Sequence, residues 1–399
     1  MKTLKRRLVV WRKKIKEIIH SEIVSGILLI ITFAVAVLIA NVEGWQQIYT
    51  NFVFYPVAFG TGNLTHTEPL IQIVNDGLMT LFFLLIGLEL KFHLVQGELR
   101  DKKNLVLPTA AALGGIIVPA LIYVFFNRDA PATLRGWAIP IATDTAFMLA
   151  ILSFFGNFIS TQLRAFIIGF SLIDDAIALI ILAIFYSKSA SIIAFFSSII
   201  LMGLLFLLNR LQITRNIYYL SLGTFLWIAM VKSGIHGTLC GVVLALAIPI
   251  EKKGQLNPSF HKLESRLRPI VYFLILPLFA FVNSGVSFEA FSLDVLTSSL
   301  ALGIMLGLFF GKQLGIFLFS YAAVKAGYCS LPHNICWPKF YAIGVLGGIG
   351  FTLSLFIGDL TFEASDPNYT MRISVIIGSL LSAILGTGIL LFLKTNKNH

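Results

Sequence analysis

Apolar stretches separated by short polar segments follow one another along almost the whole chain. Each stretch is about 17 to 25 residues long, the length that crosses a bilayer as an α-helix, and the alternating pattern of membrane-spanning strands does not occur. Because backbone groups in lipid must bond within their own segment, helices satisfy them here. We predict an all-α integral membrane protein with about twelve transmembrane helices, near residues 23–40, 70–90, 105–126, 133–155, 163–187, 190–208, 217–231, 234–250, 269–285, 299–324, 339–358 and 373–393.

Composition and charge agree with a membrane location. Hydrophobic residues make up 57% of the chain and charged residues only 12%, against about a quarter charged in soluble domains. Most of the 30 Lys and Arg residues lie in alternate connecting segments that include both ends of the chain. The positive-inside rule therefore predicts that both termini are cytoplasmic. The net charge of +11 is an orientation signal, and we expect no nucleic-acid partner.

Two parts of the chain differ in composition. Residues 1–20 carry a run of Lys and Arg, and we predict that they form a basic cytoplasmic segment lying on anionic lipid. Residues 21–399 are predicted to form a single membrane transporter domain. The three cysteines imply no disulfide framework.

Ionisable residues occupy the centres of three predicted spans. Asp144 is at the middle of 133–155, the neighbours Asp174 and Asp175 are at the middle of 163–187, and Lys312 is at the middle of 299–324. Each charge costs about 2.5–3.5 kcal/mol at that depth on insertion scales, and such residues mark ion pathways. A structural salt-bridge cluster is the alternative. Gathered around one aqueous cavity, the three carboxylates and one ammonium group offset part of one another's charge and can hold a cation, so we predict an ion-binding site.

Two of the predicted spans carry signals of an interrupted helix. Pro140 lacks a backbone donor and disrupts the helix one turn before it, and Thr143, Asp144 and Thr145 are residue types that cap a new helix start. Glycines also allow close helix packing, but a break in both spans favours two interrupted helices, spans 4 and 11. In the eleventh span, the glycines and a further candidate cap are Gly344, Gly347, Gly348, Gly350 and Thr352.

Each interrupted span is the middle of a triplet, spans 3–5 and 10–12. An offset of seven spans gives the triplets opposite orientations, which is the layout of an inverted-topology repeat. We predict core repeats at about 105–187 and 299–393, with the two broken helices crossing at the bilayer centre and the remaining spans forming an interface part. In that crossing, positive helix N-termini favour Asp144 and negative C-termini favour Lys312.

The aspartate pair suits a small, hard cation. Adjacent residues on a helix point about 100° apart, so one carboxylate is expected to face the cavity and the other to lie beside it or toward Lys312. Na⁺ and Li⁺ prefer oxygen ligands. A proton and a cation that compete for the same oxygens are exchanged without a separate proton pathway. Exchange of two protons for one monovalent cation would move net charge across the membrane. Whether Lys312 carries a proton or only balances charge stays open. The expected oxygen ligands are Asp175, Asp174, Thr143 and Asp144.

At these residues the chain resembles the NhaA family of bacterial Na⁺/H⁺ antiporters. The matching segments run in the family's order across nearly the whole chain past residue 70. They are VNDGLMTLFFLLIGLELK (74–91), GWAIPIATDTAFML (136–149), IDDAIALIIL (173–182), KSGIHGTLCGV (232–242), LPLFAFVNSGVS (276–287), GKQLGI (311–316) and GGIGFTLSLFI (347–357).

The resemblance implies a multi-pass transporter of the bacterial inner membrane, not an enzyme, that needs no cofactor. It implies electrogenic export of Na⁺ or Li⁺ in exchange for H⁺ by alternating access, for pH and sodium homeostasis. Asp174 and Asp175 are then the ion- and proton-binding pair, with Asp175 the more direct ligand. Lys312 partners the aspartates. The resemblance also implies a homodimer in membrane lipid, formed partly through an outer hairpin that the stretch 45–60 supplies.

A cytoplasmic pH-responsive region also comes with the resemblance. Its members here are Glu89 and Glu264, for which ordinary surface ion pairs are the alternative. His236 is a further candidate for tuning the pH response, with a packing histidine as the alternative. The pH set-point is left open because the pattern departs from the family at His93, Ser265 and Arg268.

Three other functions compete with the antiporter. A Na⁺-coupled symporter of the same inverted-repeat architecture needs further Arg or Lys near the crossing, where Lys312 is the only basic residue. An intramembrane aspartyl protease also places two aspartates in spans, but the GxGD and YD sequences that it uses do not occur. A cation channel uses a ring of charge, which adjacent carboxylates on one span do not form.

Overall fold

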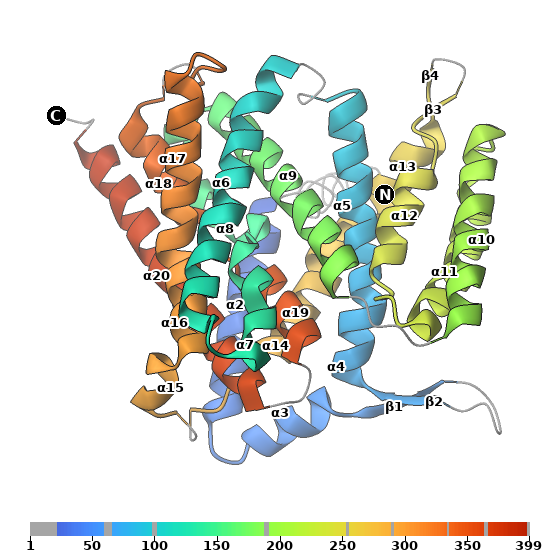
Figure 1. Ribbon diagram of the computed structural model, residues 1–399, viewed down its shortest axis with the longest axis horizontal. Coiled ribbons are helices and arrows are strands. Elements are labelled where there is room, and N and C mark those ends of the chain that lie inside the picture. Colours follow the sequence, from blue (N-terminus) through green and yellow to red (C-terminus); the bar gives the residue numbers. More distant parts are fainter. Residues whose placement is uncertain are drawn as a thin grey trace, which may run out of the picture.

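Helices make up nearly all of the regular structure in the described part of the chain (Figure 1). The computed structural model describes residues 22–59, 66–97, 102–186, 191–252, 255–288, 291–332, 335–362 and 366–396. The predicted basic segment 1–20 lies outside these residues.

The first half of the chain contains α2 (Glu22–Asn41), α3 (Gln46–Val53), β1 (Pro56–Phe59), β2 (His66–Pro69), α4 (Leu70–Gln72), η2 (Ile73–Leu78), α5 (Met79–Val95), α6 (Lys102–Asn127), α7 (Pro131–Leu134), η4 (Arg135–Ile141), α8 (Thr145–Ser153), η5 (Gly156–Phe158), α9 (Thr161–Phe185) and α10 (Ile192–Arg210). The second half contains α11 (Asn216–Ser233), α12 (Leu239–Ala247), β3 (Glu251–Lys252), β4 (Gln255–Leu256), α13 (Pro258–Ile270), η6 (Val271–Ile275), α14 (Leu276–Ser284), α15 (Leu293–Thr297), α16 (Ser299–Leu306), η7 (Gly307–Gly311), α17 (Lys312–Lys325), α18 (Trp337–Leu346), α19 (Phe351–Phe362) and α20 (Asp366–Thr395).

The described residues confirm an all-α membrane protein at the level of its spans. Nine helical segments are long and apolar enough to cross a bilayer, or ten if the bent pair Pro131–Ile141 and Thr145–Ser153 is one span. These ten correspond to ten of the twelve predicted spans. The other two, 217–231 and 234–250, correspond to α11 and α12. Because α12 has only 9 residues, it is too short to cross a bilayer alone, and the count of twelve stays a prediction.

One predicted boundary is wrong. The span predicted at 269–285 belongs to a continuous helical segment that begins at Pro258 and ends at Ser284. Asn257 caps its start by accepting a hydrogen bond from the backbone N–H of Ser259 at 3.0 Å. Pro258 follows the cap, where its missing N–H costs nothing. The residues from 258 to 268, which lie outside the predicted span, are therefore helical.

Two short antiparallel hairpins lie in connections between helices. In the first, which projects from the bundle at the lower right of Figure 1, Val57 of β1 pairs with Glu68 of β2. In the second, Glu251 of β3 pairs with Leu256 of β4. The first strand falls within the stretch predicted to supply an outer hairpin.

Large apolar side chains cover the outside of several helices. On α10, for example, Ile192, Phe196 and Ile200 are all exposed. A soluble monomer rarely exposes apolar patches that continue along a whole helix. This surface is what a helix facing lipid requires.

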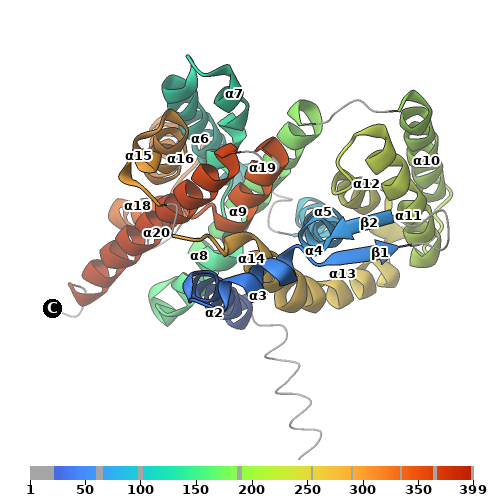
Figure 2. The ribbon, with the colours of Figure 1, turned by 90° about the horizontal axis from the view of Figure 1, so that it is seen from below.

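α6 and α17 pack side by side through small residues. A Cβ added to Gly114 would collide with the carbonyl group of Gly315, and a Cβ added to Gly315 would collide with the carbonyl group of Gly114. Glycine lets two membrane helices approach until their backbones touch. Figure 2 shows α9 and α19 in the middle of the molecule, between a group that includes α6, α16 and α20 and a group that includes α10, α11 and α12.

Candidate functional site

The site is built where two interrupted spans meet. The first span is broken between η4, which contains Pro140, and α8. The second is broken between α18 and α19, at residues 347–350. The backbone N–H of Asp144 donates to the carbonyl of Ile349 at 2.5 Å, and the Thr143 hydroxyl donates to the carbonyl of Gly347 at 3.0 Å. The two breaks therefore satisfy each other's backbone groups.

The carboxylate of Asp144 accepts hydrogen bonds from the first turns of both α8 and α19, the helices that follow the two breaks. Its Oδ1 accepts the backbone N–H of Phe147 at 3.0 Å, in the first turn of α8. Its Oδ2 accepts the backbone N–H of Thr352 at 3.1 Å and the Thr352 hydroxyl at 2.7 Å, in the first turn of α19. Asp144 is only 4% exposed. A negative charge at two helix N-termini is favourable because both ends carry partial positive charge.

The cap of α19 differs from the prediction. Thr352 was the candidate cap, but it lies inside the first turn of α19. Ser379 of α20 instead accepts the backbone N–H groups of Gly350 and Phe351, both at 3.2 Å. The glycines at 347, 348 and 350 lie between α18 and α19, and Gly348 and Gly350 pack where an added Cβ would collide with neighbouring atoms. Oxygens from distant parts of the chain thus replace a local cap.

The two adjacent aspartates of α9 point in different directions, as helical geometry predicts. Asp174 faces Lys312 of α17, whose Nζ lies 3.0 Å from Oδ2 and 3.2 Å from Oδ1. The two side chains are only 1% and 0% exposed. The Lys312 ammonium group thus donates to both oxygens of the Asp174 carboxylate.

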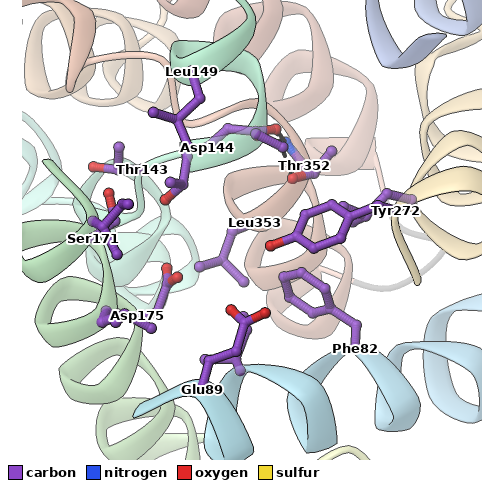
Figure 3. Close-up of a pocket in the computed structure, with 16 residues that line it drawn as sticks. Phe82, Glu89, Thr143, Asp144, Leu149, Ser171, Asp175, Tyr272, Thr352 and Leu353 are labelled. Atoms are coloured by element: carbon purple, nitrogen blue, oxygen red, sulfur yellow. Dashed lines mark hydrogen bonds between the residues drawn. The ribbon is translucent and has the colours of Figure 1, made fainter. Parts of the chain in front are cut away.

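Asp175 faces a cavity of about 70 Å³ instead. Figure 3 shows Asp175, Asp144 and Glu89 pointing into this cavity from α9, the start of α8 and α5. Phe82, Leu353 and other apolar side chains complete the wall. Its polar lining consists of Glu89, Thr143, Asp144, Thr145, Ser171, Asp175, Tyr272 and Thr352.

Asp175 differs from the other acidic groups of the site in its partners. Asp144 is hydrogen-bonded to two helix starts, and Asp174 is hydrogen-bonded to Lys312. Glu89 forms an ion pair with Arg268, with 3.0 Å between Oε1 and Nη2. Among the described residues, no hydrogen bond or ion pair reaches the Asp175 carboxylate. Because it is the one acidic group of this set that is not already engaged, it can bind a proton or a small cation from the cavity.

The residues predicted for pH response are divided between two places. Glu89 and Glu264 share one partner, because Arg268 Nη2 lies 3.0 Å from a carboxylate oxygen of each. Only Glu89 lines the cavity. His236 lies between α11 and α12, away from the cavity lining. Arg268, one of the positions at which the chain departs from the family pattern, thus bridges the two glutamates.

Sequence reasoning missed two polar residues of the cavity, Ser171 and Tyr272. For Ser171 a signal existed, since it stands four residues before Asp175 and therefore on the same helix face. Tyr272 carries no local signal, because its neighbours in the chain are ordinary apolar residues.

Comparison with known proteins points to one family. The family model described as "Na+/H+ antiporter 1" matches residues 16–390. The Na⁺/H⁺ antiporter NhaA of Rickettsia massiliae (strain Mtu5) is 54% identical to this chain, over 94% of each protein. The antiporter of the same name from Aliivibrio salmonicida (strain LFI1238) is 44% identical, over 93% of this chain and 96% of its own length. That of Vibrio cholerae serotype O1 (strain ATCC 39541) is also 44% identical, over 94% and 97%.

Proposed function

We propose that this chain, which belongs to the Na⁺/H⁺ antiporter 1 family, is a Na⁺(Li⁺)/H⁺ antiporter in which both ions compete for the carboxylate of Asp175. The observation that carries the site assignment is the unengaged Asp175 side chain, which faces an oxygen-lined cavity while the surrounding acidic groups are paired.

Competition at one carboxylate couples the two ions. An ionised Asp175 attracts a cation, for which neighbouring hydroxyl and carboxylate oxygens supply further ligands. A protonated Asp175 is neutral and releases it. The cavity therefore holds one ion or the other, and an exchange cycle follows if the cavity opens to the two sides of the membrane in turn.

The Asp174–Lys312 pair provides the second proton position. A proton entering or leaving this pair changes its charge next to the cation site, without direct contact with the cavity. Two protons moved for one Na⁺ make the exchange electrogenic, which supports sodium export and pH homeostasis in a cell with an inside-negative membrane.

Alternating access requires two halves that rock around the site. We infer an inverted repeat of residues 105–187 and 299–393 with two crossing helices. The reciprocal close contact of the Gly114 and Gly315 backbones supports it, because a two-fold axis between α6 and α17 produces such a pair of contacts. The mutual hydrogen bonds of the two breaks support it as well. In this architecture α11 is the seventh of twelve spans, and the eighth is the segment 234–250, of which α12 is the helical part.

The cellular setting follows from charge and family. We propose a bacterial inner-membrane location, with both termini in the cytoplasm because Lys and Arg crowd the segments on that side. The β1–β2 hairpin has paired strands at the edge of the bundle and is our candidate for contact with a second copy in a homodimer.

The symporter alternative receives no support from the cavity. An organic anion needs a basic partner, and the described residues that line the cavity include neither Arg nor Lys. Lys312 is bound to Asp174, and Arg372 is bound to Asp359 at 2.8 Å.

The decisive experiment measures exchange in everted membrane vesicles. Respiration establishes a proton gradient, and Na⁺, Li⁺, K⁺ or choline is added over a series of pH values. We expect Na⁺ and Li⁺ to dissipate the gradient, while K⁺ and choline do not. Asp175→Asn should insert normally and show no exchange. Full exchange by Asp175→Asn in proteoliposomes would refute the site, and loss of the gradient with choline would indicate a leak.

A further inference from the structure

Ser171 occupies a special position on α9. It lies one helical turn before Asp175, so the two side chains share one face of the helix. Ile168 and Leu172 line the cavity from the same face, whereas Asp174 does not. Figure 3 shows Ser171 between Thr143 and Asp175 at the edge of the cavity.

The Ser171 hydroxyl is buried without a hydrogen bond to any described residue. The side chain is 2% exposed, and Oγ has no protein partner. A serine or threonine inside a helix has a ready acceptor in the carbonyl one turn earlier. Other spans of this chain use that acceptor: Ser198 bonds to Ala194 and Ser374 to Thr370, at 2.9 and 2.6 Å.

A buried hydroxyl that forgoes this local bond is costly unless something else satisfies it. An ion in the cavity can satisfy the Ser171 hydroxyl, because Ser171 lines the cavity that Asp175 faces. A hydroxyl oxygen has two lone pairs and is a good ligand for a hard cation.

We infer that Ser171 supplies a neutral oxygen ligand to the cation that Asp175 binds. The inference rests on the proposed antiport function. Asp175 contributes the charge, which both a proton and a cation use. Ser171 contributes a ligand that only the cation uses, because a proton on the carboxylate needs a single oxygen. Ser171 therefore raises the affinity of the site for Na⁺ and leaves its affinity for the proton unchanged. Thr145, whose Oγ1 is also buried at the cavity wall without a hydrogen bond to any described residue, is the natural second ligand of this kind.

This division of roles gives a distinctive kinetic signature. In Ser171→Ala, the Na⁺ concentration for half-maximal exchange should rise roughly tenfold, the size expected for one lost bond to a charged partner. The rise should be the same factor at every pH, since proton affinity is unaltered. The maximal rate should stay within about twofold of the parent.

Three further variants separate ligation from packing. Ser171→Cys keeps the size but replaces oxygen with sulfur, a poor ligand for a hard cation, and should behave like Ser171→Ala. Ser171→Thr keeps the hydroxyl and should restore most of the Na⁺ affinity. Ser320→Ala removes another buried hydroxyl that has no hydrogen bond to the part of the chain that the structure describes, on α17 and away from the cavity lining. This variant should exchange like the parent.

The experiment is Na⁺/H⁺ exchange in proteoliposomes across a pH series, with direct Na⁺ titration of the detergent-solubilised protein by calorimetry. Equal Na⁺ affinity in the parent, Ser171→Ala and Ser171→Cys overturns the inference. So does an equal loss in Ser171→Ala and Ser320→Ala. If the parent itself shows no Na⁺-dependent exchange, the proposed function fails, and this result is distinguishable because it needs no variant.

Discussion

Asp174 and Lys312 form an ion pair that is almost completely shut off from solvent. Burying two charges costs several kcal/mol for each ion, and the attraction between them repays this only while both are present. The pair is thus more sensitive to the loss of one member than to the loss of both.

We predict that Lys312→Met lowers the free energy of unfolding by about 3–5 kcal/mol, because it leaves the Asp174 carboxylate buried without a cation. Asp174→Asn alone should have a similar effect through Lys312. The double variant should cost less than the sum of the two. Thermal unfolding of the four proteins in one detergent provides the measurement, and strict additivity would contradict the pairing.

Asp144 has two oxygens and uses both as caps. In Asp144→Asn, one oxygen becomes an NH₂ group, which faces a backbone N–H and cannot accept from it. We predict a loss of about 1–2 kcal/mol from the missing cap, together with weaker Na⁺ binding from the lost charge. Ser160→Ala removes a single cap from α9 and serves as the control. It should reduce stability without changing Na⁺ affinity in a titration.

At the scale of elements, the sequence predicts where a helix is interrupted more reliably than which residues contact the interrupted ends. Pro140 and the glycines from 347 to 350 act on their own helix, so their effect is visible in a short window. The caps of α19 come from Asp144, 208 residues before Thr352, and from Ser379 of α20, and no local pattern contains those contacts. The contact of Arg268 with Glu89 is likewise between distant parts of the chain, whereas its contact with Glu264 is a local one between residues four apart on one helix. The helical start at Asn257 and Pro258 was readable but fell in a stretch too polar to be taken as part of a span.

The contact between α6 and α17 makes an element-level prediction. Gly315→Ala places a methyl group against the Gly114 carbonyl and should destabilise the protein by about 1–3 kcal/mol, because the helices must separate. Gly114→Ala should do the same, and the double variant should cost less than the sum, since the helices separate only once.

At a glycine with free space around it, we expect replacement by alanine to have the opposite effect on stability. A Cβ on Gly388 of α20 meets nothing within 4 Å, so Gly388→Ala should be neutral or stabilising by up to about 1 kcal/mol through helix propensity. Thermal unfolding measures all four variants together. A destabilised Gly388→Ala beside an unaffected Gly315→Ala would contradict the close contact.

At the scale of the whole molecule, the exchange ratio determines the response to voltage. Two protons entering for each Na⁺ leaving carry one net positive charge inward. An inside-negative potential of 100 mV then adds about 2.3 kcal/mol to the driving force, which changes the limiting Na⁺ gradient by roughly 50-fold.

We predict that a valinomycin-induced potassium potential, negative inside, accelerates Na⁺ efflux from proteoliposomes and that a positive potential slows it. Radioactive sodium efflux at a fixed pH on both sides measures this directly. Vesicles with valinomycin and equal potassium inside and outside are the control. Efflux that does not change with the potential would indicate one proton for each Na⁺.

The sharing of Asp144 between α8 and α19 has an evolutionary consequence. The start of α19, in the second half of the chain, relies on a residue encoded in the first half, so a change at either end of this contact alters both helix starts. Homologous recombination that joins the first half of one gene to the second half of a divergent relative should yield working chimeras only when positions 144 and 352 come as a compatible pair.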